Sequence, residues 1–105
     1  MNSELDTVLA AIDRGLEDSL ERLFELLRFP SVGTDPTHAG DCRRTADWLV
    51  AQLAAMGFEA GARETGSQPV VVARYAARAL PSHAPHVLFY GHYDVQPADP
   101  LDLWE

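Results

Sequence analysis

The feature that most constrains the fold is a nearly continuous apolar run, His86-Val87-Leu88-Phe89-Tyr90, which ends at Gly91. Such a run is typical of a β-strand that is buried on both faces. A strand of this kind needs a packed layer on each of its two sides. The run therefore predicts an α/β fold in which other elements cover this strand.

Two segments before the run have the apolar periodicity of helices. Residues 1–28 predict one long amphipathic helix, whose stripe consists of Leu5, Val8, Ile12, Leu16, Leu20, Leu23 and Leu27. Prolines and a glycine predict a loop over residues 29–36, and a second helix is predicted from about His38 to Met56, before Gly57. Cys42 lies on the stripe of this second helix, which predicts a small buried side chain and not a reactive thiol.

After Gly57 the apolar period changes from 3.6 to 2, which predicts strands. Residues 58–64 predict a weak strand and residues 70–75 a stronger one, before a connection over residues 76–85 that is rich in proline and alanine. The predicted fold class is α/β, with two amino-terminal helices followed by strands of a mixed sheet. Because no helix follows the most buried strand, we expect residues 1–105 to be the amino-terminal part of a larger α/β domain.

Composition excludes several classes of protein. The 105 residues suffice for one small domain, and a net charge of −8 disfavours nucleic acids and anionic membrane surfaces as partners. No apolar run approaches the roughly 18–20 residues of a membrane helix. A single cysteine cannot form an internal disulfide, and the acidic amino terminus is not a secretory signal, so we expect a cytoplasmic protein.

The residues that carry chemistry follow the apolar run. His92 and Asp94 come directly after Gly91, and two residues that are two apart project to the same side of an extended chain. Neutral imidazole is a common metal ligand, and a neighbouring carboxylate often fixes its tautomer. One histidine and one carboxylate do not complete a zinc site, however, because zinc takes about four ligands. His83 and His86 lie nearby, and we interpret them as solvated or structural residues.

The segment Val87-Leu88-Phe89-Tyr90-Gly91-His92-Tyr93-Asp94-Val95-Gln96-Pro97 resembles the first metal-ligand motif of the M20 family of metallopeptidases. Residues 27–32 resemble the family's first loop, and residues 43–49 through Phe58 its second helix and the next strand. The resemblance extends from about Leu20 to Glu105. The tyrosine after His92 and the final Gln-Pro are most similar to the dipeptidase branch.

The resemblance implies metal-assisted amide hydrolysis by two zinc ions. His92 matches a zinc ligand, and Asp94 matches the active-site carboxylate that supports it. The substrate would be a small peptide or an acylated amino acid, and the whole protein would be a homodimer. The family's other ligands and its general base come later in the chain, so we expect the 105 residues alone to be inactive.

Two alternatives stay open at this point. One is an acylamino-acid deacylase or desuccinylase of the same family. The other is a truncated, non-catalytic relative that acts as a binding module, in which case the exposed strand edge would cause self-association or pairing with another chain.

Overall fold

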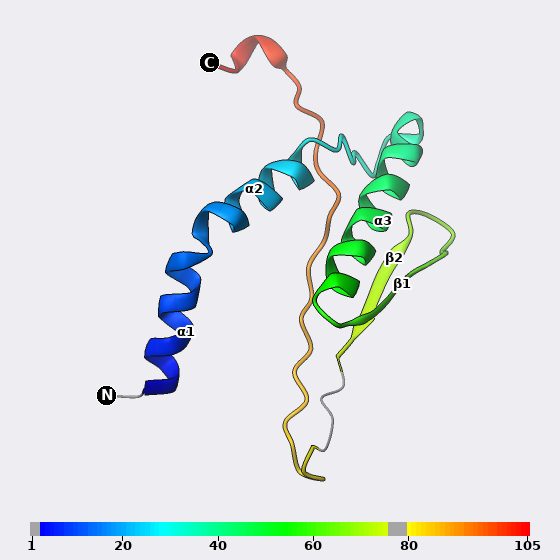
Figure 1. Ribbon diagram of the computed structural model, residues 1–105. Coiled ribbons are helices and arrows are strands. Elements are labelled where there is room, and N and C mark those ends of the chain that lie inside the picture. The colour runs from blue at the N-terminus through cyan, green and yellow to red at the C-terminus, as the bar shows by residue number, and fades with distance from the viewer. Residues whose placement is uncertain (1–2, 76–79) are drawn as a thin grey trace.

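The computed structural model describes residues 3–75 and 80–105 (Figure 1). Predictions for residues 1–2, at the start of the first helix, and for residues 76–79, in the connection after the second strand, lie outside the described residues. The described chain contains three α-helices, one two-stranded antiparallel sheet and two short 3-10 helices, Pro36–His38 and Leu101–Leu103.

The first helical segment is bent, and the prediction of one continuous helix was wrong. Helix α1 spans Ser3–Arg14 and helix α2 spans Leu16–Leu27, with Gly15 between them at φ −92° and ψ 4°. The helical hydrogen bonds continue through the bend, because Gly15 donates to Ala11 and accepts from Ser19. Glycine favours helical backbone least among residues other than proline, so the two helices change direction there (Figure 1).

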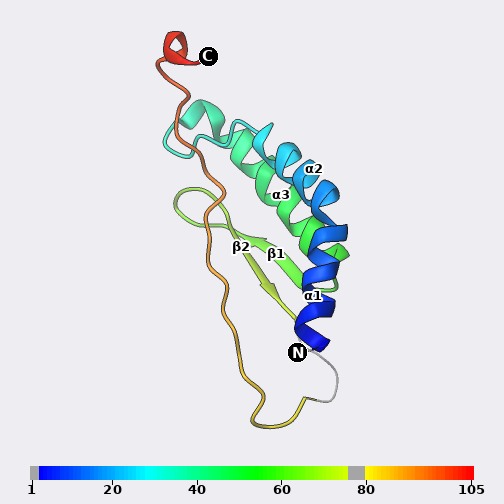
Figure 2. The same cartoon turned by 90° about the vertical axis from the view of Figure 1, so that its left-hand side faces the viewer.

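The second predicted helix and the two strands after it are confirmed. Helix α3 spans Ala39–Ala55, β1 spans Glu59–Arg63 and β2 spans Val70–Arg74. The strands form an antiparallel hairpin, in register from Glu59 opposite Arg74 to Arg63 opposite Val70. Helix α3 packs on this hairpin (Figure 2). Gly57, at φ +94°, ends the helical segment in the left-handed conformation that favours glycine.

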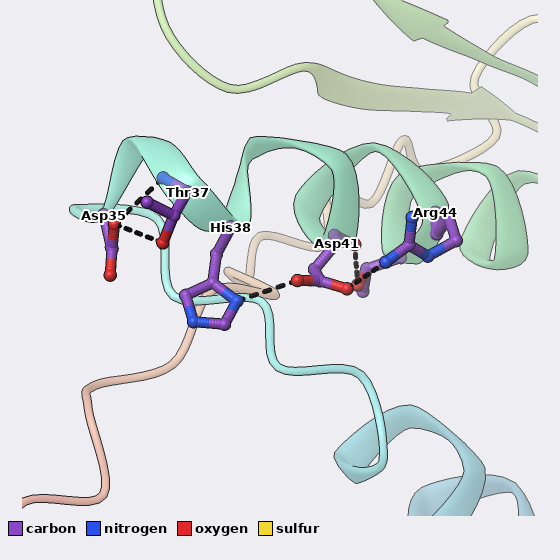
Figure 3. Close-up of polar contacts among 6 residues, drawn as sticks. Asp35, Thr37, His38, Asp41 and Arg44 are labelled. Atoms are coloured by element: carbon purple, nitrogen blue, oxygen red, sulfur yellow. Dashed lines mark hydrogen bonds and ion pairs between the residues drawn. The ribbon is translucent and has the colours of Figure 1, made fainter.

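A chain of polar contacts fixes the start of α3 (Figure 3). The Asp35 carboxylate accepts hydrogen bonds from the backbone N–H and the hydroxyl of Thr37. One turn later the Asp41 carboxylate lies 2.7 Å from Nδ1 of His38 and also pairs with Arg44. The hydrogen bond with His38 is the main cause that lowers the pKa of Asp41, so this carboxylate is stabilised in its charged form.

The apolar run at residues 86–90 does not form the predicted strand. The segment is extended but pairs with no other strand among the described residues, and Leu88, Phe89 and Tyr90 are 89%, 89% and 92% exposed. The sheet is therefore a hairpin of two strands and not the predicted mixed sheet, and the only parallel pairing in the described chain is a bridge between Val32 and Val95. A strand needs a neighbour to satisfy its backbone, and the two-stranded hairpin does not reach this run.

The buried core of the described residues is small. Its apolar members are Val32, Cys42 and Ala46, which confirms the prediction that Cys42 is buried. Neither α1 nor α2 has a fully buried residue. Two contacts join α2 and the residues just after it to α3. The ring of Phe29 lies 6.2 Å from that of Trp48, and the indole N–H of Trp48 donates a hydrogen bond to the Glu25 carboxylate.

The chain is extended for its size. Its radius of gyration is 17.5 Å, whereas a compact chain of this length has about 13 Å. Its accessible surface is 8937 Å², against about 5,800 Å² for a compact chain of this mass. Much of the surplus is apolar, because the stripe of the first two helices and the run at 86–90 are both exposed. No helix in the described parts of the chain is long and apolar enough to cross a membrane.

Candidate functional site

His92 and Asp94 lie together on the extended segment that follows Gly91. Nδ1 of His92 lies 2.9 Å from Oδ1 of Asp94 and 3.2 Å from the Asp94 backbone oxygen. Because the carboxylate accepts a hydrogen bond, this contact favours the tautomer with the proton on Nδ1. Nε2 would then carry the free lone pair, and the His92 side chain is 75% exposed.

The loop after α2 holds this segment in place. Ser31 is 1% exposed, and its hydroxyl donates a hydrogen bond of 2.8 Å to the backbone oxygen of Tyr93. The Ser31 backbone oxygen accepts a 2.9 Å hydrogen bond from the N–H of Val95. The backbone bond belongs to the short parallel bridge between Val32 and Val95, and Asp94 lies between the two anchored positions, Tyr93 and Val95.

Tyr93 is tied to the hairpin. Its hydroxyl donates a hydrogen bond of 2.5 Å to the backbone oxygen of Pro69, a buried residue immediately before β2. Burial of this half-exposed side chain raises the pKa of the Tyr93 hydroxyl. Residue Tyr93 therefore packs against the body of the protein, while His92 remains exposed.

Gly33 leaves room for the carboxylate of Asp94. A Cβ atom on Gly33 would lie 3.1 Å from both Cβ and Oδ2 of Asp94. The backbone oxygen of Gly33 accepts a 3.2 Å hydrogen bond from the Gln68 side chain, which joins this loop to the hairpin as well. Two loops that are distant in sequence thus border the His92–Asp94 pair.

A groove of about 760 Å³ opens beside the pair. Its lining comes from α3, from β2 and from the extended segment, and includes Leu49, Leu53, Val71, Tyr90, His92 and Asp94. A groove of this size that has apolar walls and a few polar groups is typical of a site for a small molecule.

The pair does not complete a metal site within the described residues. No group of three or more histidine, cysteine or acidic side chains that could hold a metal ion occurs in residues 3–75 and 80–105. His83 and His86 are exposed and belong to no such group, and Cys42 is buried with its pKa raised, first by burial. The chemistry of the pair fits one imidazole ligand with its supporting carboxylate, and further ligands are needed.

Residues that the motif did not single out complete the surroundings of the pair. Ser31 and Gly33 were assigned only to a loop, and Tyr93 was noted only as the tyrosine after His92. The available signal was the second stretch of family resemblance, residues 27–32, which contains Ser31 and ends next to Gly33. The structure brings that loop and the metal-ligand motif together.

Comparison with known proteins finds similarity to a class of enzyme, the dipeptidases, and two of the relatives are named metallodipeptidases. The chain is 30% identical to the Cys-Gly metallodipeptidase dug1 of Schizosaccharomyces pombe, over 99% of this chain and 23% of that protein. It is 32% identical to the Cys-Gly metallodipeptidase DUG1 of Candida albicans, over 82% of this chain and 20% of that protein. It is 27% identical to the cysteinylglycine-S-conjugate dipeptidase of Corynebacterium striatum, over 94% of this chain and 22% of that protein.

The chain thus spans between a fifth and a quarter of the length of these relatives. No family model and no solved structure matches it.

Proposed function

We propose that this chain forms the amino-terminal part of the catalytic domain of a zinc-dependent dipeptidase of the M20 type. His92 would bind a metal ion, and Asp94 would hold the imidazole in the orientation that binding requires. The similarity to three dipeptidases over 82–99% of this chain supports this proposal.

The observation that carries the proposal is the hydrogen bond between Nδ1 of His92 and Oδ1 of Asp94. A metal-binding histidine commonly donates its second ring N–H to a carboxylate, which fixes the tautomer and makes the imidazole more basic. No described residue forms a hydrogen bond with Nε2 of His92, and the side chain faces solvent. The pair is therefore ready to supply one ligand.

The proposed substrate is a dipeptide such as cysteinylglycine, because the relatives are named for dipeptides of this kind. Two zinc ions would activate a water and polarise the amide carbonyl when bound. This chain contributes the orientation of His92 by Asp94 and the apolar walls of the adjacent groove. No observation favours a deacylase or a desuccinylase.

The exposed apolar surface supports the proposal that these residues belong to a larger domain. The run at 86–90 has the composition of a doubly buried strand, yet its side chains face solvent. Further strands on both of its edges would satisfy its backbone, and layers packed on both faces would cover its side chains. The homodimer that the family resemblance implies stays a prediction for the whole protein.

Zinc binding to the 105-residue chain tests the role of His92. We expect weak binding in isothermal titration, together with a shift of the His92 ring nitrogens in NMR spectra when zinc is added. His92→Ala should abolish both signals, and His83→Ala, a matched control on an exposed histidine, should leave them unchanged. Equal zinc binding by the wild type and by His92→Ala would contradict the assignment.

A further inference from the structure

We propose that Ser31 and Tyr93 are positioning residues that together hold the His92–Asp94 pair in its observed place and on its observed side of the extended segment. The contacts themselves are observed, and only their consequence for metal binding rests on the proposed function.

Ser31 acts through both its side chain and its backbone. The hydroxyl binds the backbone oxygen of Tyr93, and the backbone oxygen of Ser31 receives the N–H of Val95. Because the two contacts are made by the residues on either side of Asp94, they fix the position of Asp94 relative to the loop that contains Ser31. Upstream, residues 86–91 form no backbone hydrogen bond with any described element. Ser31 therefore anchors a segment that is otherwise held weakly.

Tyr93 anchors the same segment from the opposite side. Successive side chains of an extended chain point in opposite directions, so that Tyr93 projects away from its two neighbours. Its hydroxyl reaches the backbone oxygen of Pro69, next to the hairpin. The segment is thus held between the loop at Ser31 and the turn that precedes β2.

These two anchors together determine the position and the orientation of the pair. The side-chain period of extended backbone is two, so a slip of one residue would exchange the two sides of the segment. The Tyr93 side chain would then face solvent, and His92 and Asp94 would face the hairpin. In that slipped register Tyr93 would lose its hydrogen bond to Pro69, whereas Ser31 contacts backbone groups that every residue of the segment carries. Ser31 therefore holds the segment beside its loop, and Tyr93 selects the observed side.

Two variants with matched controls test this inference in the 105-residue chain. Ser31→Ala and Tyr93→Phe each remove one hydroxyl group. Ser67→Ala and Tyr75→Phe remove the same groups from exposed side chains for which the structure shows no hydrogen bond. The readouts are the amide hydrogen exchange of Val95 and the ring-nitrogen NMR shifts of His92, with the amides of the β1–β2 hairpin as a measure of folding.

We expect Val95 to exchange about fivefold faster in Ser31→Ala and in Tyr93→Phe, which is the effect of losing one neutral hydrogen bond. The His92 ring signals should shift toward those of a solvated imidazole, while the hairpin amides and both controls stay as in the wild type. Unchanged Val95 exchange in both variants, or equal changes in Tyr75→Phe, would overturn the inference. If Ser31→Ala also loses hairpin protection, the result for Tyr93→Phe decides, because the Tyr93 side chain is partly exposed whereas Ser31 is buried in the core.

A zinc titration of the same variants separates this inference from the proposed function. Faster Val95 exchange together with weaker zinc binding supports both. Faster exchange in a chain for which neither the wild type nor any variant binds zinc at His92 supports the anchoring role and rejects the metal site. Normal exchange with intact zinc binding rejects the anchoring role alone.

Discussion

The missing side chain of Gly33 makes the space in which the Asp94 carboxylate lies. A Cβ atom at Gly33 would come within 3.1 Å of Cβ and Oδ2 of Asp94. Contacts this short force one of the two groups to move. The Asp94 side chain is partly exposed, so we expect the Asp94 carboxylate to be the group that moves. Gly33 is therefore linked to His92 through Asp94, although it touches no metal ligand directly.

Gly33→Ala is expected to displace the Asp94 carboxylate and weaken its hydrogen bond to His92. Loss of such a supporting carboxylate lowers metal affinity by about tenfold or more. NMR of the His92 ring nitrogens and a zinc titration measure the two effects. Gly66→Ala is the matched control, because a Cβ atom there meets no atom within 4 Å. Identical behaviour of the two alanine variants would argue against the contact.

Gly15→Ala is expected to straighten the arm formed by α1 and α2. Alanine favours helical backbone over glycine by about 1 kcal/mol, so the helicity of residues 3–27 should rise. Circular dichroism at 222 nm measures the change, and NMR contacts across residue 15 locate it. A lower or unchanged helix signal would mean that packing and not glycine sets the bend.

Acid is expected to loosen the start of α3. The folded-state pKa of Asp41 lies below its usual value of 3.8, first because His38 donates a hydrogen bond to it. A lowered carboxyl pKa adds stability above the usual value, and this stability is lost as the pH falls through the folded-state pKa. The free energy of unfolding should thus decrease below about pH 4. Asp41→Asn should show a smaller decrease over this range in urea titrations at several pH values, and an equal decrease would contradict the role of Asp41.

The 105-residue chain is expected to hydrolyse no dipeptide with added zinc. The described residues hold one histidine with one supporting carboxylate, and an active zinc centre takes about four ligands and a general base. Cysteinylglycine hydrolysis, followed by amine release, is a direct assay. Robust turnover that disappears in His92→Ala would show that the chain completes its site.

The exposed apolar run is expected to cause concentration-dependent association. An unpaired, extended apolar segment offers both backbone groups and side chains to a second copy. Leu88→Asp should shift the chain toward the monomer in sedimentation velocity experiments. Leu80→Asp adds the same charge at another exposed leucine outside the run. A wild-type chain that stays monomeric at all concentrations would refute this expectation.

Sequence reasoning succeeded where the signal is local. The limits of α3 and of both strands lie within one residue of the predicted ones, because apolar period and the stop at Gly57 mark them. The prediction of one continuous helix failed at Gly15, because the apolar stripe continues past this residue although the helix bends there. Sequence reasoning also failed at residues 86–90, where composition indicates a buried strand but pairing depends on neighbours that these residues do not specify.

The sequence by itself determined the helical segments, the two strands and the closeness of His92 and Asp94. These features depend on residues that are near one another along the chain, and the spacing of the pair alone puts both side chains on one side of an extended backbone. Only the tertiary structure decided which side that is. Ser31 lies 62 residues from Tyr93, and Pro69 lies 24 residues from it, and no periodicity relates such distant positions. Their contacts form only when the chain folds and brings the loop, the hairpin and the motif together.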